Sequence, residues 1–217
     1  MRLHTGIDVG GGKHDRTAIV VTEHLRSAKD SPIGRQEHES RVVHIERMAA
    51  MTPLDVATDH IIALAAKPEM AGAVYLLDAT GIGAALAQLL RRERGRGRFG
   101  ARMYAYALTA GRQSGPGSVP KQRVVNAIVE RYNMGLLGFA AGLPLTDQMV
   151  KELVAFEPVV GENGRISYGN NTSLSAFDDL VIALGLSLLH PRHGPEPRYR
   201  GRNGQVYDSF AVASDPY

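Results

Sequence analysis

The sequence predicts an α/β protein built on a mixed sheet of five strands, and the order of its apolar segments supports this. Residues 1–25 read as a hairpin and residues 41–48 as a third strand. Residues 74–77 and 102–108 read as two further strands, each reached through a helical pattern. Strands that follow one another directly favour antiparallel pairing, whereas strands reached through a helix favour parallel pairing with a right-handed crossover.

Helices complete the pattern, and their order is that of ribonuclease H-like proteins. Thr52-Pro53 predicts the cap and first residue of a helix that Pro68 stops. Further helices are predicted after residues 80–83, over 120–137, over 146–156 and over the almost wholly apolar residues 176–189, with Ser175 as the possible cap of the last. Asn163-Gly164 predicts a small hairpin over 157–170, inserted before the last helix.

Domain organisation follows from the distribution of apolar residues. Residues 1–190 carry the core-forming patterns and predict one ribonuclease H-like domain, whereas residues 191–217 are rich in Pro, Gly and Arg and predict an extended tail. The chain has 217 residues, 44% of them hydrophobic, which is enough for one substantial core. The absence of Cys excludes a disulfide scaffold and thiolate zinc sites. With no apolar signal segment, we expect a soluble, cytoplasmic protein without membrane contact.

Three acidic points fall where this fold would bring them together. Asp8 ends the first strand, Asp78 ends the fourth, and Asp178 with Asp179 opens the last helix. Neighbouring parallel strands end at one edge of a sheet, so their carboxylates are expected to converge there. Taken singly, Asp8 also suits a turn, Asp78 a helix cap, and the Asp178-Asp179 pair the positive end of a helix dipole.

Clustered carboxylates repel one another, and divalent metals relieve that repulsion. Oxygen ligands favour Mg²⁺ or Mn²⁺, and two such ions about 3.5–4 Å apart suit phosphodiester cleavage. We therefore predict a two-ion site in which Asp8 bridges both ions, Asp78 holds one, and Asp178 or Asp179 holds the other. The glycines within residues 6–12 would allow a metal or phosphate to approach the backbone closely.

Basic residues are concentrated in two regions despite a net charge of only +3. Such patches are compatible with a polyanion and equally with solvated surfaces. Six Arg fall within residues 91–102 and four within 192–202. The residues expected to contact DNA phosphates, without reading sequence, are Lys13, Arg16, Arg94, Arg96, Arg98 and Lys121.

Four segments in this order resemble the nuclease domain of tailed-bacteriophage large terminase subunits. They are residues 6–12 (GIDVGGG), 77–83 (LDATGIG), 119–121 (VPK) and 177–184 (FDDLVIAL). The chain departs from the family at Phe177, where His is frequent, and at Ile182, where a further Asp is frequent. The resemblance covers residues 1 to about 190 and lacks the family's ATPase domain, so we expect an excised domain or a split gene.

The resemblance implies a Mg²⁺- or Mn²⁺-dependent endonuclease that cuts concatemeric viral DNA during genome packaging. It places the metal-binding acids at Asp8, Asp78 and the Asp178-Asp179 pair. The implied partners are double-stranded DNA, a packaging ATPase domain, the portal and the small terminase subunit.

Three alternatives remain open at this stage. A Holliday-junction resolvase or another ribonuclease H-like nuclease would use the same acids. A DNA-binding or docking module of a packaging motor would keep the fold without cutting. Residues 6–12 are also similar to the phosphate loop of sugar kinases and actin-like ATPases, although no second such loop is present.

Overall fold

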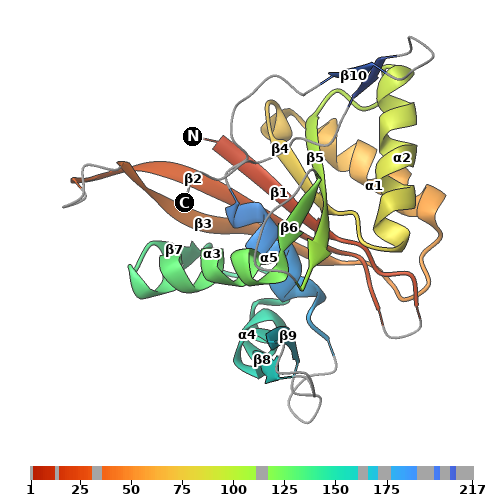
Figure 1. The fold of residues 1–217 in the computed structure, drawn as a ribbon. Helices are drawn as coiled ribbons and strands as arrows, with labels where there is room; N and C mark the ends of the chain where they lie inside the picture. The colour runs from red at the N-terminus through yellow and green to blue at the C-terminus, as the bar shows by residue number, and fades with distance from the viewer. Residues whose placement is uncertain are drawn as a thin grey trace.

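The computed structural model describes residues 2–12, 15–30, 36–110, 117–160, 166–170, 177–189, 198–200 and 206–208. A mixed sheet is its centre, with the strand order β6-β5-β4-β1-β2-β3-β7 (Figure 1). The strands are β1 (Arg2–Asp8), β2 (Ala18–Asp30), β3 (Gln36–Arg47), β4 (Val74–Asp78), β5 (Arg102–Thr109), β6 (Ser118–Pro120) and β7 (Leu137–Phe139). β1, β2 and β3 pair antiparallel, β4 pairs in parallel with β1, and β5 pairs in parallel with β4. This confirms the predicted ribonuclease H-like order.

The sheet has seven strands rather than the predicted five. The two additional strands, β6 and β7, are three residues each and extend the two edges in parallel. β6 lies at the start of the third helix, where residues 118–120 were expected to be loop and helix. Both strands are too short for alternation of apolar and polar residues to reveal them.

Helices cover both faces of the sheet (Figure 1). On one face, α1 (Leu54–Ala65) and α2 (Ile82–Gly95) pack over Ile7, Tyr75 and Leu77. On the other face, α3 (Lys121–Asn133) and α5 (Asp179–Leu188) pack over Val20 and Leu76. Adjacent positions of β1 and β4 therefore face opposite cores, as expected for strands buried on both sides.

Several smaller elements complete the fold. α4 (Thr146–Ala155) leads into β8 (Phe156–Val160), which pairs antiparallel with β9 (Ile166–Asn170), so the predicted hairpin is confirmed. A 3-10 turn spans Pro68–Met70. The sequence did not predict the short antiparallel pair β10 (Arg198–Arg200) and β11 (Val206–Asp208). Ser175, the possible cap of the last helix, lies outside the described residues. The boundary between domain and tail at residue 190 stays a prediction. No helix in the described part is long and apolar enough to cross a membrane.

The start of α1 differs from the prediction. Pro53 is the N-cap, and no side chain caps this helix. The hydroxyl of Thr52 donates instead to the carbonyl of Ala49, at 2.7 Å. Thr52 therefore closes the preceding turn.

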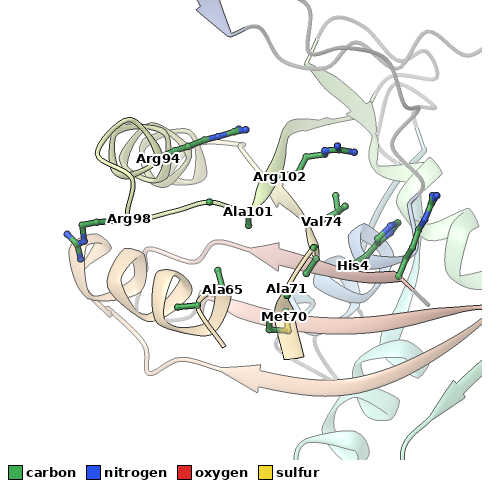
Figure 2. Close-up of a pocket in the computed structure, with 14 residues that line it drawn as sticks. His4, Ala65, Met70, Ala71, Val74, Arg94, Arg98, Ala101 and Arg102 are labelled. Atoms are coloured by element: carbon green, nitrogen blue, oxygen red, sulfur yellow. The ribbon is translucent and has the colours of Figure 1, made fainter. Parts of the chain in front are cut away.

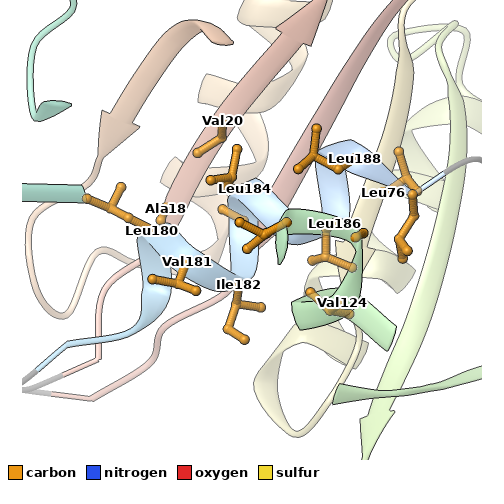
Figure 3. Packing of buried hydrophobic residues seen from close by; sticks show 14 of the residues in the cluster. Ala18, Val20, Leu76, Val124, Leu180, Val181, Ile182, Leu184, Leu186 and Leu188 are labelled. Carbon is orange, nitrogen blue, oxygen red and sulfur yellow. The ribbon is translucent and has the colours of Figure 1, made fainter. Parts of the chain in front are cut away.

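The buried helix α5 packs its apolar side chains against Ala18, Val20 and Leu76 of the sheet (Figure 3). It runs along β1 in the opposite direction, and this arrangement positions the acidic residues. At its C-terminal end, the Leu189 carbonyl accepts a hydrogen bond from Nδ1 of His4, at 3.1 Å. In its middle, a Cβ added at Gly6 would lie only 1.9 Å from the Ala183 carbonyl oxygen. The N-terminal end of α5, which begins at Asp179, is thereby brought to the end of β1 at Asp8.

Replacing Gly6 by Ala is expected to destabilise the protein, because the methyl group would overlap backbone atoms of α5 that cannot move independently. We expect a cost of about 2–4 kcal/mol in the free energy of unfolding, measured by urea denaturation. Gly95→Ala is the matched control, since Gly95 is the last residue of α2 and an added Cβ meets no atom within 4 Å. Equal effects of the two substitutions would show that α5 does not depend on this contact.

A buried polar network ties α5 to the first three strands. His24 donates Nε2–H to the Ser187 carbonyl at 3.0 Å, and its Nδ1 pairs with the Ser40 hydroxyl at 3.0 Å. The rings of His4 and His24 lie 4.3 Å apart, and both side chains are buried. Burial is the main cause that lowers the pKa of His4 from 6.5 to about 4.

The unfolding free energy is expected to fall as the pH drops from 6.5 towards 4, because only the unfolded chain protonates His4 in that range. The difference between the two pKa values corresponds to about 3 kcal/mol of unfolding free energy. This stability is fully present above pH 6.5 and is lost as the pH falls. His4→Asn keeps an N–H donor for Leu189 and removes the titration, so its stability should depend less on pH in this range. Parallel pH profiles for the two proteins would contradict this.

Candidate metal centre

Asp8 and Asp78 occupy the same edge and the same face of the sheet. β1 and β4 are parallel neighbours, with Ile7 opposite Leu77, so both strands end at their aspartates. Gly6 and Leu76 lie two residues earlier and face α5. Because side chains alternate along a strand, Asp8 and Asp78 face α5 as well.

Asp8 is the point on which the acidic side chains converge. Its pKa is raised well above the usual value, first by burial and then by the negative charges of Asp78, Asp178, Asp179 and Asp15. Within the described part of the chain, no hydrogen-bond donor or cation contacts the Asp8 carboxylate. The ionised form of Asp8 is therefore disfavoured in the protein as it stands.

Asp78 is held by the turn that follows β4. Its Oδ1 accepts a hydrogen bond from the Thr80 backbone N–H, at 2.7 Å, while the Thr80 hydroxyl accepts one from Leu108 N–H, at 2.8 Å. Burial raises the pKa of Asp78, and the hydrogen bonds from Thr80 oppose that rise. Gly81 is the N-cap of α2 and no side chain caps this helix, so Asp78 does not act as its cap.

Asp178 directs its carboxylate towards the start of α3. Its Oδ2 lies 3.0 Å from Nζ of Lys121, and both side chains are about one-third exposed, at 36% and 28%. The positive charge of Lys121 also lowers the pKa of Asp78. Lys121 is therefore a cation that faces this carboxylate cluster, and its contact with a DNA phosphate stays a prediction.

Asp179 belongs to a different, buried ion-pair network. Its Oδ2 lies 3.0 Å from Nε of Arg47, and Arg47 also contacts Glu152 through Nη2. Oε2 of Glu152 in turn accepts the Leu180 backbone N–H, at 3.1 Å. Burial raises the pKa of Asp179 to about 6, with Arg47 opposing the rise. Neither Arg47 nor Glu152 was singled out in the sequence, because an Arg at a strand end and a Glu inside a helix carry no distinctive pattern.

Phe177 lies between two arginines next to this pair of aspartates. The guanidinium groups of Arg16 and Arg47 lie 5.2 and 5.3 Å from the centre of its ring. Aromatic faces attract cations at such distances. Arg16 is thereby brought beside the acidic cluster, and its contact with DNA stays a prediction; Lys13 lies outside the described residues.

The arginines of residues 91–102 do not lie at this edge. α2 begins four residues after Asp78, and Arg94 comes twelve residues further, which amounts to about 18 Å of helix. Arg96 pairs with Glu93 at 2.9 Å, and Arg98 pairs with Glu93 at 2.8 Å and with Asp59 at 2.7 Å. The predicted DNA contacts of Arg94, Arg96 and Arg98 thus fall at the opposite edge of the sheet from the carboxylates.

Three glycines near Asp8 serve packing within the chain, and their role in the close approach of a metal or phosphate stays a prediction. Gly6 admits α5, as described above. A Cβ at Gly10 would lie 2.3 Å from the Arg16 backbone nitrogen, and one at Gly11 would lie 2.5 Å from the Ile82 side chain. The spaces beside these glycines are therefore filled by protein atoms.

The oxygen ligands of these carboxylates suit a hard divalent cation, although the side chains are not arranged around a common metal position. Among the described residues, no three His, Asp or Glu side chains form a group that could hold a metal ion. Asp178 is paired with Lys121, and Asp179 with Arg47. The donors are all oxygen atoms, and the like charges that crowd Asp8 are relieved by a cation. Binding would require Asp178 to separate from Lys121.

Comparisons with known proteins give likenesses only among solved structures; no family model and no curated protein sequence matches the chain. The large terminase nuclease of thermophilic phage G20c with bound cobalt matches with a TM-score of 0.59 at 16% identity, over 86% of this chain and 80% of that chain. The same nuclease with bound magnesium matches with a TM-score of 0.59 at 17% identity, over the same shares.

A second phage nuclease has a similar fold. The large terminase nuclease domain of Thermus phage P74-26 matches with a TM-score of 0.54 at 17% identity, over 86% of this chain and 77% of that chain. These likenesses confirm, at the level of the fold, the resemblance drawn from the sequence. The chain has the ribonuclease H-like fold of large terminase nuclease domains.

Proposed function

We propose that this chain is a metal-dependent DNA endonuclease of the large terminase type, cutting concatemeric viral DNA during genome packaging. The observation that carries the proposal is the convergence of Asp78 and Asp178 on Asp8, a carboxylate that no cation or hydrogen-bond donor in the described part of the chain contacts. The fold shared with phage nucleases supports it, as does the binding of cobalt and magnesium by one of those nucleases.

Asp8, Asp78 and Asp178 would hold Mg²⁺ or Mn²⁺, with two ions expected. Such ions, when bound, activate water and stabilise the leaving oxygen of a phosphodiester. Asp178 is favoured over Asp179 because Asp179 is engaged with the buried Arg47–Glu152 pair. Once separated from Asp178, Lys121 would be placed to contact a DNA phosphate, and Arg16 would lie beside it.

The packaging context is part of the proposal. Double-stranded DNA would be the substrate, and a packaging ATPase domain, the portal and the small terminase subunit would be the partners, in the cytoplasm of a phage-infected host. Lys121 and Arg16 are the cations beside the acidic residues, and they would contact mainly phosphates and not bases.

Cleavage of supercoiled plasmid tests this function. We expect nicked and linear products with Mn²⁺ or Mg²⁺, none with EDTA, and none with Asp8→Ala. Cutting that survives both EDTA and Asp8→Ala would contradict the proposal. A four-way junction should be cut no faster than linear duplex; a large preference for the junction would assign a resolvase instead.

The two adjacent aspartates are expected to behave differently. Asp178→Asn should lower the cleavage rate by about 10²-fold or more and abolish Mn²⁺ binding, since it removes an oxygen that faces Asp8. Asp179→Asn should retain Mn²⁺ binding and lose no more than about tenfold in rate, because its carboxylate contacts Arg47. Isothermal titration with Mn²⁺ and plasmid cleavage measure both quantities. The reverse order of effects would assign Asp179 as the ligand.

A further inference from the structure

A pocket of about 580 Å³ opens at the edge of the sheet opposite to the carboxylates. Its arginines come from the start of β1, the end of α2, the turn after α2 and the start of β5, and they are Arg2, Arg94, Arg98 and Arg102 (Figure 2). His4 also lines the pocket, and its lowered pKa keeps it neutral at pH 7. No Asp or Glu lines it in the described part of the chain. This volume lies within the range of small-molecule sites, roughly 300–1,000 Å³.

The pocket is separate from the candidate metal centre. Arg2 precedes Asp8 by six residues along β1, which is about 20 Å of extended chain. Arg102 stands opposite Val74, four residues before Asp78, which is about 13 Å of strand. A group bound in the pocket therefore cannot touch the carboxylates.

The arginines of the pocket differ in the direction of their side chains. Arg98 forms ion pairs with Asp59 and Glu93, so carboxylates of the chain already balance its charge. Arg94 and Arg102 are exposed, and Figure 2 shows both guanidinium groups extended in one direction while that of Arg98 points the opposite way. Arg94 and Arg102 are thus the arginines best placed to act together on a ligand.

Small apolar side chains line the rest of the pocket. Ala71, Ala73, Val74 and Ala101 contribute short side chains, and Gly72 and Gly100 contribute none. Within the described part of the chain, the space in front of the arginines is consequently not filled by large side chains. A guanidinium group recognises a planar pair of oxygens with two parallel hydrogen bonds, which suits phosphate.

We propose that this pocket binds a phosphate group, held chiefly by Arg94 and Arg102 with Arg2 as a third cation. The phosphate belongs either to a mononucleotide seated in the pocket or to a DNA backbone that passes its rim. The proposal does not depend on the nuclease function, because the two sites lie at opposite edges and no metal is needed here.

Fluorescence-detected binding in EDTA tests the proposal, so that neither a metal nor DNA cleavage contributes. One arm uses a fluorescent ADP analogue with pyrophosphate as the competitor, and the other uses a labelled 20-base-pair duplex. The variants are Arg102→Ala and Arg94→Ala in the full chain. The control is Arg92→Ala, an exposed arginine on the same helix that does not line the pocket and causes the same change in charge.

We expect Arg102→Ala and Arg94→Ala each to weaken binding about tenfold or more, the loss typical of a hydrogen bond to a charged group. The control should change affinity less than twofold. A loss confined to the ADP arm identifies a mononucleotide phosphate, and a loss confined to the duplex arm identifies a DNA backbone phosphate.

Two results would overturn the proposal. One is unchanged affinity for both ligands in Arg102→Ala and Arg94→Ala. The other is an equal loss in Arg92→Ala, which would show that overall charge, and not the pocket, attracts the ligand. Both pocket arginines are exposed, so their replacement by Ala should leave the protein folded, and thermal unfolding verifies this.

Discussion

Asp8→Asn is expected to abolish metal-dependent DNA cleavage and, in the absence of metal, to make the protein more stable. Burial and four neighbouring carboxylates raise the pKa of Asp8, so its charged form is disfavoured at neutral pH. Asn removes that charge at nearly constant shape. We expect the cleavage rate to fall by more than about 10²-fold and Tm in EDTA to rise by about 2–4 °C, the shift that 1 kcal/mol produces in a domain of this size.

The sign of the pH dependence follows from the raised pKa. Asp8 takes up its proton at higher pH in the folded protein than in the unfolded chain. Protonation therefore removes the destabilising negative charge of Asp8 as the pH falls. The stability advantage of Asp8→Asn should therefore be largest at neutral and alkaline pH and shrink on acidification. Adding Mn²⁺ should raise Tm of the natural protein and leave that of Asp8→Asn unchanged. A lower Tm for Asp8→Asn in EDTA would contradict this account of the site.

Arg47→Met is expected to be the most destabilising substitution near the site. The side chains of Arg47, Glu152 and Asp179 are only 7%, 0% and 4% exposed, and the guanidinium group is the cation between the two carboxylates. Removing one partner leaves buried negative charges uncompensated, which costs about 3–5 kcal/mol. Urea denaturation at pH 7.5 measures the loss.

Two further variants isolate the cause. Arg92→Met changes the same charge at a side chain that is 60% exposed, and its effect should stay within about 0.5 kcal/mol. Arg47→Met combined with Glu152→Leu should recover part of the loss, because one of the stranded carboxylates is removed. A double variant no more stable than Arg47→Met alone would mean that packing against Phe177, and not charge, accounts for the role of Arg47.

The sequence predicts the strands and helices in which apolar residues recur at regular spacing. Apolar runs ending at Asp8 and Asp78, and an apolar helix beginning at Asp179, specify neighbouring strands and a covering helix. The antiparallel pairing of β1 to β3 follows from chain order, and the helices that precede β4 and β5 favour their parallel addition. The convergence of the acidic residues at one edge is a consequence of that topology.

Contacts between distant residues could not be predicted in this way. The partners of Asp179 are Arg47 and Glu152, which lie 132 and 27 positions away and become neighbours only when α4 and α5 pack at the end of β3. The difference between Asp178 and Asp179 depends on those partners. Likewise, a glycine that admits a helix and a glycine that admits a phosphate look identical in sequence, so the role of Gly6 emerges only from its contact with Ala183.

A crystal of the protein soaked in Mn²⁺, measured at a wavelength that gives anomalous scattering from manganese, tests the central claim most directly. The account predicts anomalous density bounded by Asp8, Asp78 and Asp178, with Nζ of Lys121 displaced from its present position 3.0 Å from Asp178. Asp179 should remain paired with Arg47. Saturating Mn²⁺ without density among these three carboxylates, and with the Lys121–Asp178 ion pair intact, would contradict it.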